Sequence, residues 1–229
     1  MMRPVYIIDG ARTPFLKARS GPGPFSPVDL AVQAGRPLLA RQPFAPSAFD
    51  QVILGCVSVI ADEMNPARIA ALRLGMGEAM TAFTVQINCG SGMQSIDTAQ
   101  RYIREGRADL ILAGGTEALS YSPLIFPRGG VRWFAGMMGA RTPFEKVMAA
   151  LRWRPSYFKP VIGLERGLTD PVVELNMGQT AEILAHVFRI SRQEADSFAV
   201  ESHLRLARAQ AEGYLKGEVE TAFGRDGKI

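Results

Sequence analysis

The stretch FTVQINCGSG, residues 83–92, joins an apolar run to a glycine-rich turn and decides the fold that we expect for this chain. Residues 83–87 predict a buried strand, and residues 93–105 predict a helix. Cys89 therefore lies between a strand end and a helix start, where backbone N–H groups and the helix dipole favour a thiolate. The glycines allow a substrate to approach the backbone closely. This arrangement predicts a nucleophilic cysteine for acyl transfer, although a free cysteine is more commonly a small buried apolar residue.

Apolar runs alternate with helical patterns through residues 1–120. Strands are predicted at 5–8, 52–57, 83–87 and 110–113, and helices are predicted to begin at Ser26, Asn65 and Met93. The apolar faces expected on the last two helices are Ile69 with Leu72, and Met93 with Ile96, Ala99 and Ile103. Such alternation indicates an α/β fold with a mostly parallel sheet covered by helices. Cys89 would then lie at the carboxyl end of a strand, where ligands bind in these sheets.

The alternation stops at Tyr121, and the stretch from there to about Asn176 is rich in Gly, Pro, Arg and aromatic residues. Within it, residues 142–145 match a capping box. An apolar stripe follows at helical spacing and consists of Phe144, Val147, Met148 and Leu151. Further helices are predicted at 177–188 and, after a second capping box at 191–194, to about residue 212.

Composition argues against a membrane-spanning protein, a disulfide-stabilised protein and a four-cysteine zinc protein. The 229 residues are 47% hydrophobic and 21% charged, which is typical of a globular protein. No apolar run approaches the roughly 18 residues of a membrane span, and because a strand is predicted to begin at Val5 we expect no signal peptide. Two cysteines, Cys56 and Cys89, are too few for a disulfide framework or a four-ligand zinc site. We therefore expect reduced thiols, no metal and a cytoplasmic protein.

Two further features bear on the site. Cys56 lies inside an apolar strand pattern, and we expect it to be structural. Gly114 and Gly115 end another predicted strand, and we expect them to allow close packing near the Cys89 loop.

Five short motifs, taken in order along the chain, resemble those of the thiolase family. They are Gly10-Ala11-Arg12-Thr13-Pro14-Phe15, Asn65-Pro66-Ala67-Arg68, Asn88-Cys89-Gly90-Ser91-Gly92-Met93-Gln94, Ala113-Gly114-Gly115-Thr116-Glu117 and Met177-Gly178-Gln179-Thr180-Ala181-Glu182. Each is weak alone, but together they resemble the N-terminal half of a thiolase, an acetyl-CoA acyltransferase.

The resemblance implies a role for Cys89 and a division of the chain. Cys89 would be the acyl-accepting nucleophile in thiolysis of a 3-ketoacyl-CoA to acetyl-CoA and a shortened acyl-CoA, or in the reverse Claisen condensation. Residues 1–120 would form the N-terminal α/β core. Residues 121–229 would form an inserted helical loop domain over the coenzyme A site, with a basic and aromatic insertion at about 128–166. Coenzyme A would be a substrate, and no cofactor is expected.

The chain also departs from the family pattern. Thiolases use a second cysteine and a histidine from the C-terminal half, and this chain stops at Ile229 before either motif. The histidines present, His186 and His203, match no catalytic position of the family. We therefore expect a half-chain that is inactive when isolated. Asn176 stands where short-chain biosynthetic thiolases have histidine, which favours the fatty-acid β-oxidation branch, close to the β subunits of trifunctional complexes. The resemblance also implies that Met177 contributes to substrate binding.

The expected partners are acyl-CoA, coenzyme A and further copies of the chain in a homodimer or tetramer. The segment 128–166 carries +6, while the rest of the chain carries −2. Because this charge is local, we expect no nucleic-acid binding. Three interpretations stay open: contact with coenzyme A phosphates, contact of residues 142–154 with an anionic membrane or a β-oxidation partner subunit, or a lid packed on the body.

Two other functions remain possible from the sequence. One is a catalytically incompetent half-domain that dimerises or binds coenzyme A. The other is a condensing enzyme similar to a ketoacyl synthase, which shares the half-fold and a cysteine nucleophile but uses two histidines in its second half.

Overall fold

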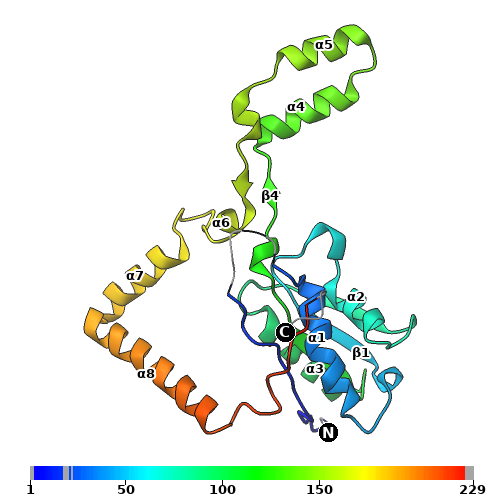
Figure 1. Cartoon of the computed structure of the whole chain (residues 1–229), viewed down its shortest axis with the longest axis vertical. Helices are drawn as coiled ribbons and strands as arrows, with labels where there is room; N and C mark the ends of the chain where they lie inside the picture. The colour runs from blue at the N-terminus through cyan, green and yellow to red at the C-terminus, as the bar shows by residue number, and fades with distance from the viewer. Residues whose placement is uncertain (1–2, 18–20, 22, 225–229) are drawn as a thin grey trace. The chain divides into compact units, whose positions relative to one another are not determined.

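The computed structural model describes residues 3–17, 21 and 23–224 of the 229-residue chain. The chain divides into two compact units, one formed by residues 1–121 with 199–229 and the other by residues 122–198 (Figure 1). The division after residue 121 coincides with the change in sequence pattern at Tyr121. Residues 199–229 group with the first unit.

The first unit contains a three-stranded parallel sheet, as the sequence predicts. Its strands are β1 (Gln51–Gly55), β2 (Thr81–Val85) and β3 (Ile111–Gly115), in the order β2-β1-β3. In register, Gln51 lies opposite both Thr81 and Ile111. The three strands therefore end at one edge of the sheet, and the connections that follow them are brought together there.

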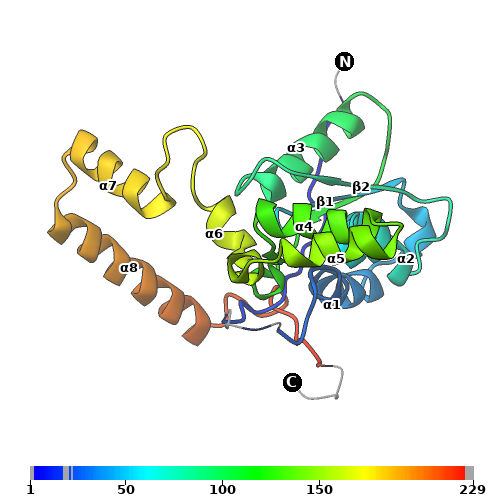
Figure 2. The same ribbon diagram turned by 90° about the horizontal axis from the view of Figure 1, so that it is seen from above.

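Helices cover both faces of this sheet (Figure 2). The helices are α1 (Pro27–Ala40), α2 (Pro66–Arg73) and α3 (Ser91–Arg104). Val52 and Leu54 of β1 belong to the hydrophobic core that α1 and α2 build on one face. Successive strand side chains alternate in direction, so the buried Ile53 points to the opposite face, which α3 covers. Short 3-10 helices complete the unit at η1 (Pro46–Ala48), η2 (Ala61–Glu63) and η3 (Leu119–Tyr121).

The predicted start of α1 is confirmed in detail. The Ser26 side chain accepts a hydrogen bond from the Asp29 amide, and the Asp29 carboxylate accepts one from the Ser26 amide. Pro27 occupies the first helical position, where its missing N–H costs nothing. The Glu63 carboxylate also accepts a hydrogen bond from the Val28 amide, which gives the positive end of the helix a negative partner.

The predicted strand at residues 5–8 is wrong. This segment has no regular secondary structure and pairs with no strand among the described residues, and Ile7 is 88% exposed. An apolar run forms a strand only where a neighbouring strand offers its N–H and C=O groups, and no such neighbour is present in the described part of the chain. The other three predicted strands are confirmed with their ends shifted by one or two residues.

The predicted apolar faces of α2 and α3 are also wrong in part. The buried residues of α2 are Pro66, Ala67, Ala70 and Ala71. On α3, Ala99 of the predicted face is buried as expected, together with Ser91 and Ser95, whereas Met93 is 72% exposed. Small side chains make most of the contact with the sheet, although Ile69 of the predicted α2 face is partly buried and packs against the core.

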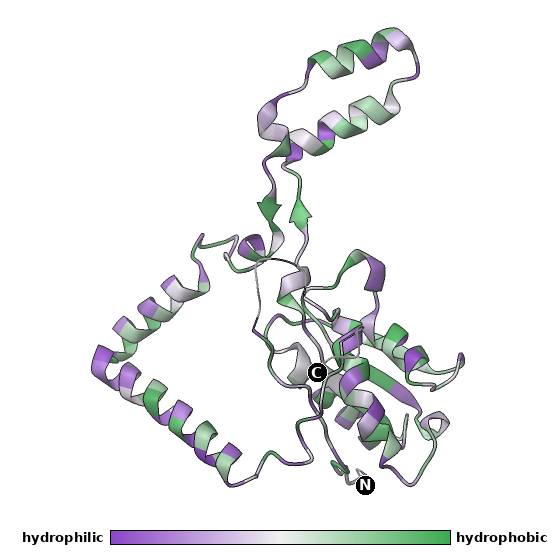
Figure 3. Ribbon diagram, in the orientation of Figure 1, coloured by the Kyte–Doolittle hydropathy of each residue, from purple (hydrophilic) through white to green (hydrophobic). Residues whose placement is uncertain are grey.

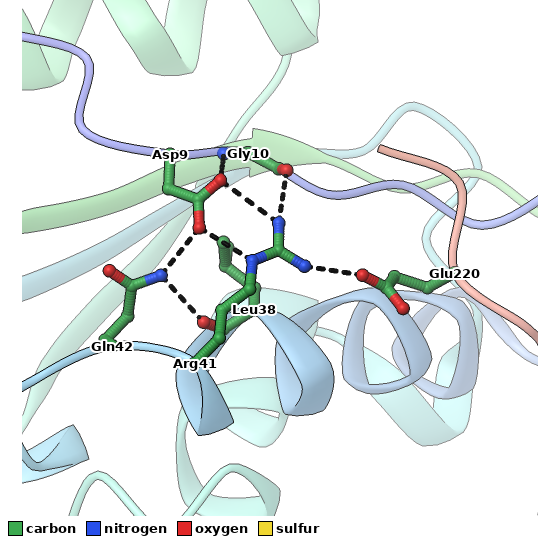
Figure 4. Close-up of polar contacts among 6 residues, drawn as sticks. All are labelled: Asp9, Gly10, Leu38, Arg41, Gln42 and Glu220. Atoms are coloured by element: carbon green, nitrogen blue, oxygen red, sulfur yellow. Dashed lines mark hydrogen bonds and ion pairs between the residues drawn. The ribbon is translucent and has the colours of Figure 1, made fainter. Parts of the chain in front are cut away.

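A polar network joins the N-terminal segment, the end of α1 and the segment near residue 220 (Figure 4). The Arg41 guanidinium donates to the Asp9 carboxylate at 2.7 Å and to the Glu220 carboxylate at 2.5 Å. Hydrogen bonds from Arg41 hold the pKa of Asp9 well below its usual range, with further contributions from the Gly10 amide and the Gln42 side chain. The network fastens two segments that are distant in sequence onto α1.

The second unit contains a helical hairpin on a short two-stranded ladder. The ladder pairs β4 (Leu124–Ile125) with β5 (Val161–Ile162) in antiparallel fashion, and the hairpin consists of α4 (Arg128–Gly139) and α5 (Pro143–Leu151). The segment from α5 back to β5 contains the 3-10 helix η4 (Pro155–Phe158). Edge-to-face or tilted ring contacts link Phe126, Trp133, Phe134, Trp153 and Phe158. The predicted capping box at Thr142 and Glu145 is confirmed.

Three further helices follow the hairpin, namely α6 (Gly163–Gly167), α7 (Met177–Phe188) and α8 (Arg192–Ala211). The predicted helices at 177–188 and after 191–194 are thereby confirmed. Across the described residues, no helix combines the length and apolar character needed to cross a membrane.

Candidate active site around Cys89

Cys89 is exposed on the connection between β2 and α3. β2 ends at Val85 and α3 begins at Ser91, so the connection leaves the carboxyl edge of the sheet. Asn88, directly before the cysteine, has a φ of 55°. This left-handed conformation is uncommon for residues with a side chain, but asparagine tolerates it better than most. The position that the sequence predicts for Cys89, between strand and helix, is confirmed.

The buried side chain of Ser91 ties the Cys89 loop together. Its hydroxyl accepts a hydrogen bond from the Ile87 amide at 2.9 Å and donates one to the Asn88 carbonyl at 2.6 Å. The Ser91 amide also donates to the Asn88 carbonyl, at 3.0 Å. These bonds fix the backbone before Cys89 and turn the chain into α3. The N–H groups of a first helical turn lack intrahelical acceptors, so this loop end favours negative charge.

Glycines allow the start of α3 to lie directly on the ends of two strands. A Cβ atom added to Gly55 at the end of β1 would overlap the Ser91 carbonyl group and lie 2.6 Å from the Gly92 nitrogen. A Cβ atom added to Gly115 at the end of β3 would lie 3.2 Å from the Gly92 Cα atom. The expected close packing of Gly114-Gly115 beside the Cys89 loop is therefore confirmed at Gly115.

Ser95 adds a second fastening one turn along α3. Its hydroxyl lies 2.7 Å from the Gly92 carbonyl oxygen and 2.6 Å from the Gly114 carbonyl oxygen. Ser95 is 0% exposed, so its hydroxyl joins the helix to β3 without contact with water. The helix that follows Cys89 is thus held against the sheet at both Gly55 and Gly114.

Cys56 has the structural environment that the sequence predicts. It is 1% exposed at the end of β1, and its amide donates to the Val85 carbonyl. Burial raises the pKa of the Cys56 thiol to about 12, and the carboxylates of Glu117 and Glu63 contribute in the same direction. A thiol with so high a pKa stays protonated near neutral pH, so Cys56 is a poor nucleophile.

Glu117 joins the loop that follows β3 to the loop that follows β1. Its carboxylate accepts hydrogen bonds from the amides of Val57 at 2.9 Å and Ser58 at 3.1 Å. The amide of the preceding residue, Thr116, donates to the Gly55 carbonyl. Glu117 lies in the loop after β3, and its carboxylate therefore holds the backbone of the loop after β1. In the sequence Glu117 is the last residue of the motif at residues 113–117, and the structure assigns it this contact.

The other candidate residues lie on helices of the later part of the chain. Met177 is the first residue of α7 in the second unit, and Asn176 caps that helix by accepting from the Gln179 amide at 2.9 Å. The role of Met177 in substrate binding stays a prediction. His186 and His203 are exposed on α7 and α8. The described part of the chain gathers no three His, Cys, Asp or Glu side chains able to hold a metal ion.

Comparison with known proteins gives a consistent result. Residues 5–228 match the family model described as thiolase, N-terminal domain. Over 220 residues the chain is 33% identical to an Escherichia coli (strain K12) protein named 3-oxoadipyl-CoA/3-oxo-5,6-dehydrosuberyl-CoA thiolase, covering 95% of this chain and 51% of that protein. The structure of human mitochondrial 3-ketoacyl-CoA thiolase superimposes with a TM-score of 0.75 at 32% identity, covering 97% of this chain and 52% of that one.

A third similar structure is the Acat5 thiolase from Ascaris suum in complex with coenzyme A, with a TM-score of 0.77 and 26% identity. The match covers 93% of this chain and 50% of that one. The chain therefore spans about half the length of each of these three proteins.

Proposed function

Because this chain belongs to the thiolase family, we propose that it supplies the acyl-accepting half of a thiolase and that Cys89 is the nucleophile. The observation that carries the proposal is the exposed thiol on a braced loop at the carboxyl edge of the sheet, beside the start of α3. The second thiol, Cys56, is buried and stays protonated. Among the two cysteines, Cys89 alone is accessible to an acyl-CoA.

The proposed reaction is thiolysis of a 3-ketoacyl-CoA. The Cys89 thiolate attacks the 3-keto carbon, and the bond between carbons 2 and 3 breaks. The electron pair of that bond leaves with acetyl-CoA as a carbanion, which takes a proton from an acid that we assign to residues outside this chain. The acyl group stays on Cys89 as a thioester until the thiolate of a second coenzyme A displaces it. The reverse sequence is a Claisen condensation, and coenzyme A is a substrate in both directions.

We further propose that turnover requires residues beyond this chain. The chain spans 51% of the Escherichia coli relative, and acid–base groups each contribute about 10²–10⁴-fold to rate. Simple exchange with acetyl-CoA is less demanding, because it releases a stable thiolate and forms no carbanion. The isolated chain should therefore accept an acetyl group slowly but should not carry out steady thiolysis.

Intact-mass measurement after incubation with acetyl-CoA tests this proposal. We expect one acetyl group on the wild type and on Cys56→Ser, and none on Cys89→Ser. An adduct that survives in Cys89→Ser would place the nucleophile elsewhere. A chain that binds coenzyme A but gains no acetyl group in any variant would favour the non-catalytic half-domain.

The α4–α5 hairpin supports a proposal about partners. Figure 3 shows hydrophobic residues along both helices of the hairpin. The apolar residues of α5 that remain exposed are Phe144, Val147, Met148 and Leu151. Residues 128–154 contain six basic residues and one acidic residue, Glu145, whose carboxylate accepts from the amides of Arg141 and Thr142. An apolar stripe among cations suits an anionic lipid surface, and we propose that surface as the partner of this hairpin.

We also propose that the whole protein is a cytoplasmic homodimer or tetramer. Both cysteines are free thiols, as expected for a reducing compartment. Tyr6, Ile7 and Ile8 are exposed in the described part of the chain, and contiguous exposed apolar residues commonly mark a contact surface.

A further inference from the structure

We propose that Ser91 is a positioning residue for Cys89, an inference that rests on the proposed function of Cys89. Ser91 is 3% exposed, and both hydrogen bonds of its hydroxyl go to the loop that precedes the cysteine. These bonds hold the Ile87 amide and the Asn88 carbonyl in place. Between these two groups lie the peptide bond that joins Ile87 to Asn88 and the left-handed backbone of Asn88. The hydroxyl thereby fixes the direction in which the next residue, Cys89, leaves the loop.

The hydrogen-bond pattern excludes a direct catalytic role for the Ser91 hydroxyl in this geometry. A serine hydroxyl carries a single proton. In Ser91 that proton is directed to the Asn88 carbonyl at 2.6 Å, and a lone pair accepts from the Ile87 amide. No proton is left for a substrate oxygen or for the Cys89 sulfur. Ser91 therefore acts on the reaction through the loop backbone.

Removing the Ser91 hydroxyl should release the Ile87 end of the Cys89 loop. In Ser91→Ala the Asn88 carbonyl keeps the Ser91 main-chain amide as a donor at 3.0 Å, whereas the Ile87 amide loses the side-chain acceptor. A left-handed asparagine is less favourable than one in the ordinary helical or extended regions. Without the hydrogen bond from the Ile87 amide to the Ser91 hydroxyl, the Asn88 backbone is free to relax toward those regions. Cys89 then turns away from the start of α3, where the helix dipole favours a thiolate.

Ser95 provides a matched control on the same helix. Its hydroxyl is also buried and also lies within hydrogen-bond distance of two groups, the carbonyls of Gly92 and Gly114. Those groups lie after Cys89 and on β3, so Ser95→Ala removes a buried hydroxyl without freeing the loop before the cysteine. A merely structural role for Ser91 predicts similar behaviour of the two alanine variants.

The test measures acetylation of Cys89 by acetyl-CoA in the full 229-residue chain, by mass spectrometry over a range of acetyl-CoA concentrations. A misplacement of about 1 Å can cost about 10²-fold in rate. We expect Ser91→Ala to lower the saturating rate by at least about 10-fold, with little change in the half-saturating concentration. Ser95→Ala loosens only the contact of α3 with β3, after the cysteine, and should lower the saturating rate less than Ser91→Ala does. Ser91→Thr keeps the hydroxyl and should retain most of the rate.

Urea unfolding of each variant separates positioning from stability. Alanine is smaller than serine and favours helix, so Ser91→Ala should fold. Equal acetylation rates in Ser91→Ala and Ser95→Ala, with the wild type acetylated on Cys89, would overturn the positioning role alone. Absence of acetylation in the wild type would overturn the proposed function and this inference with it. Loss of rate in Ser91→Thr equal to that in Ser91→Ala would also contradict a role for the hydroxyl.

Discussion

Replacing Gly55 by alanine should disrupt the packing that places the Cys89 loop. Gly55 ends β1, and the backbone at the start of α3 lies directly over it. An added Cβ atom would overlap the Ser91 carbonyl group and lie 2.6 Å from the Gly92 nitrogen. Both contacts are with backbone atoms, so no side-chain rotation relieves them. The start of α3 must therefore move away from the sheet, and the Cys89 loop must move with it.

The size of the effect follows from the required movement. The Gly92 nitrogen alone must retreat by about 0.8 Å to reach an ordinary contact distance of 3.4 Å. Overpacking usually costs about 1–3 kcal/mol when side chains and backbone can adjust. Because α3 is also fastened to β3 through Ser95, we expect a loss of about 3 kcal/mol or more in the unfolding free energy of the first unit. Acetylation of Cys89 should fall as well.

Gly114→Ala is the matched control, since a Cβ atom there meets only the Leu54 Cδ2 atom, at an ordinary 3.8 Å. Both tryptophans lie in the second unit, so their fluorescence does not report on this sheet. The assay is therefore modification of the buried Cys56 thiol by a thiol reagent along a urea gradient. If Gly55→Ala and Gly114→Ala unfold at the same urea concentration, the close approach of α3 to β1 is wrong.

Three other predictions concern separate features. Thr142→Ala removes the cap of α5 and should cost about 1 kcal/mol, measured by tryptophan fluorescence in urea; an unchanged midpoint would contradict the cap. The lowered pKa of Asp9 stabilises the fold at pH values above the usual aspartate pKa of about 3.9, and this contribution is lost as pH falls through the lowered pKa. In Asp9→Asn the unfolding free energy should therefore decrease less steeply with falling pH. An unfolding free energy with the same dependence on acid pH as the wild type would refute the Arg41 contact. Val147→Glu/Leu151→Glu should abolish salt-sensitive sedimentation with anionic liposomes, whereas binding indifferent to lipid charge and to both substitutions would favour a lid.

Much of the first unit is predictable because its elements follow local rules. The parallel sheet follows from apolar runs that alternate with helices, and the start of α1 follows from Ser26 and Asp29. Strand ends are less predictable, because an apolar run does not mark where pairing with a neighbour stops. The segment at residues 5–8 shows the same limit in stronger form, since it has no strand to pair with among the described residues.

Helix faces were harder to predict, since the packing of α3 depends on partners distant in sequence. The predicted stripe is Met93, Ile96, Ala99 and Ile103, yet of these the structure buries Ala99, together with Ser91 and Ser95. Serines bury there because carbonyl groups such as that of Gly114 satisfy their hydroxyls. Hydrophobic periodicity contains no information about such acceptors.

The candidate site is predictable at its centre and not in its support. The sequence predicts that Cys89 lies between a strand end and a helix start, and the structure confirms that position. The roles of Ser91 and Gly55 depend on atoms that meet only in the folded chain. Their signals in the sequence are a serine at the first position of a helix and a glycine at the end of an apolar strand, and both patterns have many ordinary explanations.

The most direct test of the central claim is to map the thiol that reacts first with limiting iodoacetamide in the native chain. We predict labelling of Cys89 and almost none of the buried Cys56. Prior incubation with acetyl-CoA should protect Cys89 from the label, because the acetyl group occupies the same sulfur. Preferential labelling of Cys56, or labelling of Cys89 that acetyl-CoA leaves unchanged, would contradict the assignment of Cys89 as the acyl-accepting nucleophile.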